Sequence, residues 1–317
     1  MSGNLQELLR HGATYAPHYL PSYNSNHLPM TLIAMSKLGA TDALLEEFHC
    51  AYSSRLHESP VVTALPDQWR SCWGERDAYP LMRSYFLDQL SRHGIALTVG
   101  KHMPSLLSGI ALDAFHPIIR LGYAVDSCCE LEVAASMAYM TVSHVPMPVN
   151  QHLGIDLEKQ LSHQTSQGAV ALPATPFSQS LNELAARGLY PVGTVDDMAV
   201  LAKTALRLYQ TSRNFFALHL VTATQALRVA MQGLSIQTRQ TGIAAMTGAL
   251  LASHIVLGSP TLDKPLMLPM ILDKEHAIKY AWACLSEYRH YGDATYLEEI
   301  DRFRNANLIP SWVASED

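Results

Sequence analysis

Histidine is the side chain of this sequence best suited to chemistry, because imidazole binds metal ions and transfers protons near neutral pH. The chain holds 15 histidines beside 22 lysines and arginines. Five of them stand in apolar stretches with helical spacing: His27, His116, His219, His254 and His276. Nine others stand beside polar residues or in expected loops, and we expect them at the surface: His11, His49, His57, His93, His102, His144, His152, His163 and His290.

A buried imidazole needs partners for its ring nitrogens, since leaving a buried polar group unpaired costs on the order of a few kcal/mol. One such histidine is typical of a hydrogen-bonded core residue. Several on different apolar helices also fit a shared metal site, which helical proteins build from inward-facing side chains. The sequence has no HExxH motif and no HxD pair, so local spacing alone does not choose between these two interpretations.

Lys279 follows His276 by three residues and is expected on the same helical face. It could form an ion pair with Asp273 or Glu275. Alternatively, burial beside a cation would lower its pKa. The neutral amine could then add carbon dioxide and form a carbamate that binds a metal as a carboxylate does.

Apolar residues recur at intervals of three and four along most of the chain, which predicts an all-α protein. We expect one large bundle-like helical domain over residues 1–317. The predicted helices are Leu28–Leu38, Asp42–Leu56, Ala78–His93, Ile118–Met140, Val195–Gln210, Asn214–Met231, Gly242–Leu257 and Lys274–Tyr291. A region rich in Pro, Ser and Gln, about residues 141–181, is predicted to be a long loop that serves as a linker or a lid.

Composition excludes several classes of protein. The chain is 48% hydrophobic and only 16% charged, which excludes disorder, and its net charge of −6 with scattered basic residues argues against nucleic acid. The stretch Gln240–Leu262 has no charged residue, but its apolar part is shorter than the roughly 20 residues that a membrane-spanning helix needs. The segment Met1–Arg10 lacks the basic and apolar regions of a secretory signal peptide. Five cysteines without a CxxC pair indicate neither a zinc knuckle nor a disulfide framework. We therefore expect a cytoplasmic protein with no membrane or nucleic-acid partner.

The sequence resembles the questin oxidase-like family over nearly its whole length. The segments that carry the resemblance are NHLPMTLIAMSKLGA from Asn26, AFHPIIRLGYAV from Ala114, FFALHLVTATQALRV from Phe215, SHIVLG around His254 and EHAIKYAWACLSEY from Glu275. The resemblance implies an oxidoreductase that cleaves or oxidises a quinone-like or polyketide-type aromatic substrate with molecular oxygen.

The family's motif histidines correspond to His27, His116, His219 and His254, and its motif lysine corresponds to Lys279. We therefore expect these five residues to hold a non-haem Fe(II), with Lys279 as the residue that could be carboxylated. Arg120, Thr222 and His276 each share a helical face with one of them and are expected to orient the ligands. Five aromatic residues are candidates for a substrate-pocket wall: Phe115, Tyr123, Phe215, Phe216 and Trp282.

Three alternatives remain open from the sequence. The first is an NADPH-dependent Baeyer–Villiger-type monooxygenase without a metal, although no GxGxxG or GxxxxGK[ST] motif is present. The second is a non-catalytic helical binding protein with a decayed site. The third is a hydrolase that holds zinc with the same ligands.

Overall fold

The computed structural model describes residues 3–266 and 272–313, and helices make up 66% of it, which confirms the all-α class. The α-helices are α1 (Gly3–Gly12), α2 (Leu28–Lys37), α3 (Asp42–Ser53), α4 (Tyr79–Leu106), α5 (His116–Ser127), α6 (Glu130–Val142), α7 (Leu157–Gln167), α8 (Phe177–Ala186), α9 (Met198–Ser212), α10 (Phe215–Ala230), α11 (Ile236–Val256), α12 (Lys274–Tyr291) and α13 (Thr295–Asn305). Short 3-10 helices are η1 (Trp69–Cys72), η2 (Arg76–Ala78), η3 (Leu107–Gly109) and η4 (Leu112–Phe115). The two strands β1 (His18–Tyr19) and β2 (Asn24–Ser25) form one antiparallel hairpin.

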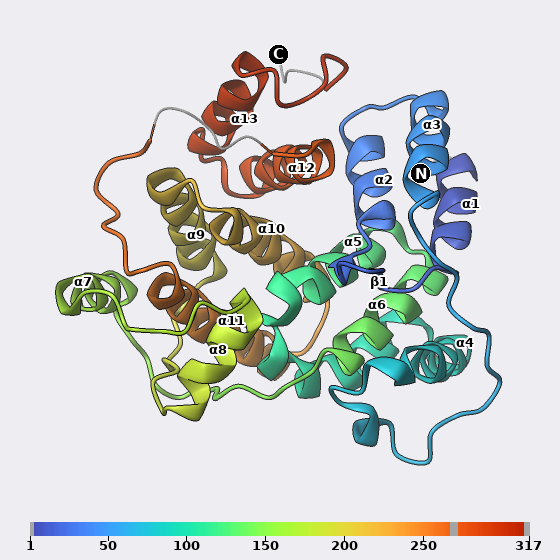
Figure 1. The fold of residues 1–317 in the computed structure, drawn as a ribbon, viewed down its shortest axis with the longest axis horizontal. Helices are drawn as coiled ribbons and strands as arrows, with labels where there is room; N and C mark the ends of the chain where they lie inside the picture. Colours follow the sequence, from blue (N-terminus) through green and yellow to red (C-terminus); the bar gives the residue numbers. More distant parts are fainter. Residues whose placement is uncertain (1–2, 267–271, 314–317) are drawn as a thin grey trace.

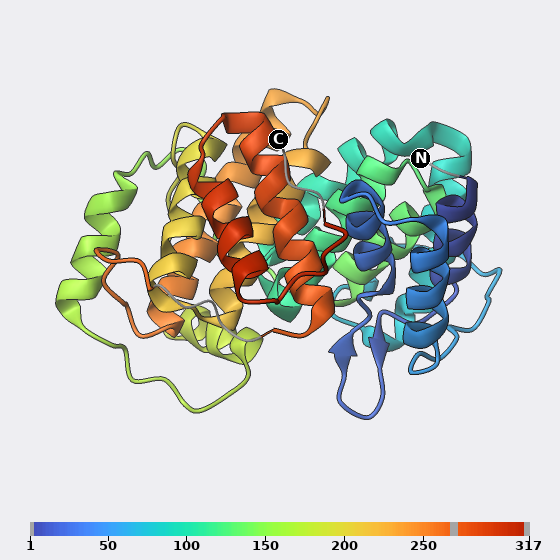
Figure 2. The same ribbon diagram turned by 90° about the horizontal axis from the view of Figure 1, so that it is seen from above.

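Helices from the two ends of the chain meet in the middle of the molecule. Figure 1 shows α1–α4 and α6 on one side, α7–α11 on the other, and α5 between them. Helix α12 packs against both α2 and α10, and α5 packs against both α6 and α10. Figure 2 shows the β1–β2 hairpin projecting beside α2. The arrangement brings the N-terminal ends of α2, α5, α10 and α12 into one region.

Helices α5 and α10 approach each other unusually closely because Gly122 has no side chain. A Cβ atom at Gly122 would lie 2.4 Å from the carbonyl oxygen of Ala226, a distance that side chains do not adopt. His116 precedes Gly122 by six residues, and His219 precedes Ala226 by seven. The close contact therefore fixes how α5 and α10 are aligned along their axes, and with it the position of His116 relative to His219.

Two expectations about the elements are wrong in detail. The region 141–181 contains α7 and the first half of α8, so it is not a continuous loop. The Asp156 side chain accepts a hydrogen bond from the backbone of Lys159 and caps α7, a local signal that the Pro-rich composition hid. The predicted helix Ile118–Met140 is two helices, because Cys128 adopts a left-handed conformation with φ of 51° between α5 and α6.

The most apolar helices are packed inside the protein. Helix α11, which contains most of the uncharged stretch, is buried along most of its length. Within residues 3–266 and 272–313, no helix combines the length and the apolar character needed to cross a bilayer.

Candidate metal centre

Four histidines and one lysine from four helices lie together in the interior. His27 caps the N-terminus of α2, His116 is the first residue of α5, His219 lies in the second turn of α10, and His276 lies in the first turn of α12. The His27 and His116 Nε2 atoms are 2.8 Å apart, and those of His116 and His219 are 3.3 Å apart. One ring nitrogen from each of His27, His116 and His276 lies within 4.8 Å of the other two.

Local sequence places these rings at helix ends. Proline follows closely at Pro29 and Pro117, in the first turns of α2 and α5, where its missing N–H costs nothing. The Asn214 side chain accepts a hydrogen bond from Phe216 N and starts α10, and Asp273 does the same for α12 through His276 N. The positive ends of four helix dipoles thus converge on the imidazoles and disfavour their protonated form.

In three of the rings Nδ1 lies beside an oxygen that can only accept a hydrogen bond, so Nδ1 must carry the proton. His116 Nδ1 donates to the Asp113 carbonyl at 2.6 Å, and His219 Nδ1 donates to the Phe215 carbonyl at 2.8 Å. His276 Nδ1 donates to an Asp273 carboxylate oxygen at 2.5 Å. A neutral imidazole carries one N–H, so the Nε2 atoms of all three rings carry lone pairs.

The lone pairs have too few donors to satisfy them. His27 can donate one proton from Nε2 to His116, but the His219 lone pair still faces that of His116 at 3.3 Å. His276 Nε2 is buried and has no hydrogen-bond partner within the described chain. Converging acceptors of this kind repel each other unless a cation lies among them. Metal–nitrogen bonds of about 2.0–2.1 Å place neighbouring ligand nitrogens about 3 Å apart, as found here.

The imidazoles are held neutral, which is the form that binds a metal. Burial is the largest cause that lowers the pKa of His27, His116 and His219 well below the ordinary value, and the neighbouring positive groups lower it further. Burial also lowers the pKa of His276 to about 4, although Asp273 opposes the change. All four rings are therefore ready as ligands at neutral pH.

Lys279 lies against this cluster from the next turn of α12. Its side chain is buried, and its charge lowers the pKa values of His27, His116, His219 and His276. Its Nζ forms no direct ion pair among residues 3–266 and 272–313, so the possible pairing with Asp273 or Glu275 is not a direct contact, although both carboxylates act on its pKa and oppose the effect of burial. Burial lowers the pKa of Lys279 to about 8.

His254 is not brought into this cluster. It lies near the end of α11, where its Nδ1 is 2.7 Å from the Gln164 amide oxygen and its Nε2 is 2.9 Å from the Pro260 carbonyl oxygen. One N–H of the ring can donate to one of these two oxygens, so both nitrogens face α7 and the loop after α11. The structure therefore places His254 outside the cluster of the other four histidines. A core histidine with such local partners has the same apolar sequence context as a metal ligand.

The three residues expected to orient ligands have different positions. His276 itself belongs to the cluster and lies beside His27 and His116, a position that the predicted supporting role did not include. Arg120 forms a buried bidentate ion pair with Glu132 at 2.9 Å and does not contact the cluster histidines. Thr222 donates to the His219 backbone carbonyl at 3.1 Å and so supports the helix, whereas the His219 ring is oriented by Phe215.

A small cavity of about 160 Å³ opens onto the cluster. His27, His116 and His276 line it together with Phe215 and with residues of the hairpin, α12 and its cap. Phe215 packs edge-on against His219 and His276, with ring centroids 4.5 and 4.8 Å away. The other four candidate wall residues do not line this cavity. They are Phe115, Tyr123, Phe216 and Trp282.

No pattern in the sequence indicates the carbonyl that orients His116. Asp113, Ala114 and Phe115 all have left-handed backbone conformations, with φ of 47°, 52° and 66°. Such conformations are unfavourable for residues with side chains and are concentrated at functional sites. Here the turn aims the Asp113 carbonyl at His116 Nδ1. Asp273 stands directly before Lys274 and Glu275, a sequence position typical of a helix cap. Its second role, as the acceptor for His276 Nδ1, requires the folded α12.

Three histidines expected at the surface are instead buried. His49, His102 and His144 are 8%, 1% and 2% exposed. His102 Nδ1 donates to the Thr98 carbonyl, and its ring packs against Trp69 and Phe86. The surface prediction rested on polar neighbours in the sequence, which do not indicate how a side chain packs in the folded protein.

A comparison with known protein families identifies the family of the chain. The family model described as questin oxidase-like matches residues 24–190, just over half of the chain. The chain belongs to the questin oxidase-like family. The questin oxidase-like match includes His27 and His116, while His219, His276 and Lys279 lie beyond it and join them only through the fold. A search of curated proteins found no match. Membership in this family supports an oxidoreductase acting on an aromatic substrate.

Proposed function

We propose that the protein is a non-haem iron oxygenase that oxidises or cleaves a quinone-like or polyketide-type aromatic substrate with molecular oxygen. One observation carries the metal: ring nitrogens of His27, His116 and His276 lie within 4.8 Å of one another in the interior, and His219 Nε2 lies 3.3 Å from His116 Nε2 with no proton between them. Family membership supports the oxidative chemistry and the aromatic substrate. Iron is favoured over zinc because zinc has no redox step to offer an oxygenase.

The protein groups have distinct tasks in this proposal. His27, His116, His219 and His276 would hold the metal, and Asp113, Phe215 and Asp273 fix three of the rings through their Nδ1 protons. When bound, iron supplies the one-electron chemistry that activates oxygen. Phe215 covers two ligands and narrows the cavity, which limits the access of water to the centre.

We further propose that Lys279 acts in its carboxylated form. An ammonium group beside a divalent cation would place two cations side by side in the interior, and neither of the nearby carboxylates, Asp273 and Glu275, forms a direct ion pair with Lys279. The neutral amine can attack carbon dioxide, forming the N–C bond of a carbamate and releasing one proton to solvent. The carbamate would then carry a negative charge at the end of the Lys279 side chain, and it would lower the charge of the Fe(II) site from +2 to +1.

Metal analysis combined with oxygen uptake tests this function. Protein purified from iron-supplied cells is expected to contain about one iron per chain, while His219→Ala should contain little. Oxygen consumption with a hydroxyanthraquinone should depend on the iron and fail in Lys279→Met. Carbon-13 NMR of protein equilibrated with labelled bicarbonate should show a carbamate signal that is absent in Lys279→Met.

The same assay separates the alternatives. Substrate oxidation that requires NADPH and persists after complete metal removal would contradict the iron oxygenase and favour the metal-free monooxygenase. A well-folded wild-type protein that binds no metal would favour a decayed site. Zinc binding with hydrolysis and no oxygen uptake would favour the hydrolase.

A further inference from the structure

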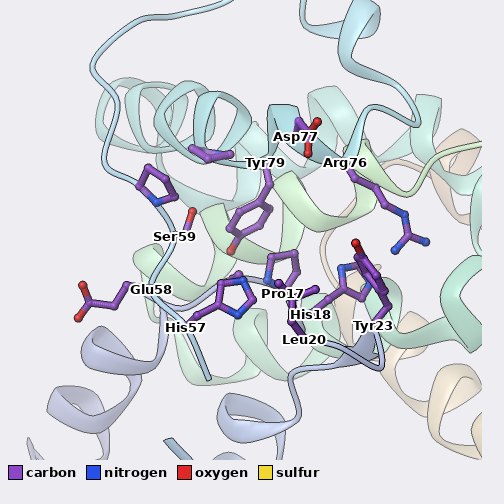
Figure 3. Close-up of a pocket in the computed structure, with 13 residues that line it drawn as sticks. Pro17, His18, Leu20, Tyr23, His57, Glu58, Ser59, Arg76, Asp77 and Tyr79 are labelled. Carbon is purple, nitrogen blue, oxygen red and sulfur yellow. The ribbon is translucent and has the colours of Figure 1, made fainter. Parts of the chain in front are cut away.

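A second and larger cavity lies on the other side of the β1–β2 hairpin. Its volume is about 350 Å³, and it is enclosed by the hairpin, the segment 57–60, η2 and the start of α4 (Figure 3). This volume falls within the usual range for small-molecule sites, about 300–1,000 Å³, whereas the 160 Å³ metal cavity does not reach that range. The metal cavity by itself is therefore too small for a fused aromatic ring system.

The walls of the larger cavity suit a flat ring system. Prolines, tyrosines and small aliphatic groups form about half of the lining: Ala16, Pro17, Leu20, Tyr23, Pro60, Tyr79 and Pro80. The other lining residues are polar: His18, His57, Glu58, Ser59, Arg76 and Asp77. Leu20 and Tyr23 are 58% and 61% exposed, although both are large apolar side chains. Covering them with an aromatic ligand would remove apolar surface from water at about 25 cal/mol per Å².

Two polar side chains face this cavity with fixed orientations. His18 Nε2 lies 3.1 Å from the Asp113 carboxylate and 3.2 Å from the Tyr139 hydroxyl, which Ser25 also contacts. One guanidinium nitrogen of Arg76 donates to the other Asp113 carboxylate oxygen at 3.1 Å. Because Asp113 holds both groups, His18 Nδ1 and the remaining guanidinium nitrogens stay available to a ligand. Figure 3 shows both side chains beside the aromatic ring of Tyr23.

The cavity is connected to the metal centre through Asp113 and the hairpin. The Asp113 carboxylate binds His18 and Arg76, while its backbone carbonyl accepts the Nδ1 proton of His116. The hairpin supplies His18, Leu20 and Tyr23 to the larger cavity. It supplies Tyr19, Asn24 and Ser25 to the metal cavity. The same short hairpin thus lines both cavities.

We infer that the larger cavity binds the fused-ring part of the aromatic substrate, and that His18 and Arg76 contact its phenolic or quinone oxygens. This inference rests on the proposed function for the class of substrate. Imidazole can accept a phenolic hydrogen, and the guanidinium group can donate to a carbonyl or phenolate oxygen. His18 and Arg76 are therefore specificity-determining residues, whereas the four cluster histidines hold the metal.

Equilibrium binding of 1,8-dihydroxyanthraquinone, followed by quenching of tryptophan fluorescence, tests the inference. Leu20→Trp places a large ring at the cavity mouth from an exposed position and should raise Kd at least about tenfold, as should Arg76→Ala. Arg92→Ala is the matched control, because Arg92 pairs with Asp88 on the surface of α4 outside the cavity, and its Kd should stay within about twofold of wild type. Thermal melting confirms that each variant is folded.

Two results would overturn the inference, and they have different meanings. Unchanged binding in folded Leu20→Trp, together with lost binding in Phe215→Trp, would place the ring system in the metal cavity and leave the proposed function intact. A wild-type protein that binds iron but none of a series of mono-, di- and trihydroxylated anthraquinones would overturn both this site and the aromatic substrate class. Iron content measured on the same samples separates the two cases.

Discussion

The Nε2 atoms of His116 and His219 face each other at 3.3 Å, although each ring donates its Nδ1 proton to a backbone carbonyl. Two lone pairs at this distance repel each other in a buried site of low dielectric constant. Folding must therefore hold them together through the packing of α5 on α10. A cation at this position would turn the repulsion into attraction.

Metal binding is accordingly expected to stabilise the protein. A ligand that binds only the folded state at 100 times its Kd adds about 2.7 kcal/mol to the free energy of unfolding. Chelator-treated protein should regain thermal stability when Fe(II) is added without oxygen, whereas His116→Ala should not respond. Melting curves that are identical with and without every divalent transition metal would argue against the centre.

Replacement of His276 and of His254 should have opposite consequences. His276→Ala removes a ring of the cluster, so we expect loss of most of the bound metal. His254→Ala leaves the Gln164 and Pro260 oxygens without their partner, so it should retain metal but unfold about 1–3 kcal/mol more easily. Elemental analysis and urea titration of both variants provide the measurement. Metal loss in folded His254→Ala with full retention in His276→Ala would reverse our assignment.

Acid should destabilise the metal-free protein through the buried histidines. The pKa of His276 is about 4 in the fold and about 6.5 in the unfolded chain, so between these values the unfolded state binds more protons. Its contribution to stability is complete above pH 6.5 and is lost as the pH falls toward 4, by about 3 kcal/mol. His27, His116 and His219 act in the same direction.

Urea titrations of the metal-free protein between pH 7 and 4 would reveal this dependence. His276→Phe should flatten the pH profile relative to wild type, because phenylalanine does not titrate. An unchanged profile in this variant would show that His276 is already protonated in the folded protein.

The close contact between α5 and α10 should be needed for metal binding as well as for stability. Gly122→Ala would force the Cβ against the backbone of Ala226, and such overpacking costs about 1–3 kcal/mol. The displaced helices would also separate His116 from His219 and weaken metal binding. Gly100→Ala in α4 is the control, because its Cβ would meet Leu234 at an ordinary 3.6 Å. Calorimetric titration with Fe(II) checks both variants, and normal affinity in Gly122→Ala would contradict the argument.

The family, the helical class and part of the site were accessible from the sequence. Apolar spacing predicted α2, α3, α9, α10 and α12 within about three residues at each end, and α11 without its first six residues, because each of these helices has a continuous buried face. The same periodicity could not reveal the break at Cys128, where one residue changes conformation without changing the pattern. It also passed over His18, whose importance comes from its contact with Asp113, 95 residues away.

The sequence by itself determined which residues were candidates: imidazoles in apolar helices, with Lys279 three positions after His276. Only the tertiary structure decided which of them meet. His254 and His276 both stand on predicted helices with apolar spacing, yet His254 lies against Gln164 and Pro260 while His276 joins His27 and His116. The physical reason is that periodicity identifies the buried face of a helix, whereas the partner of that face is set by helix packing between distant parts of the chain.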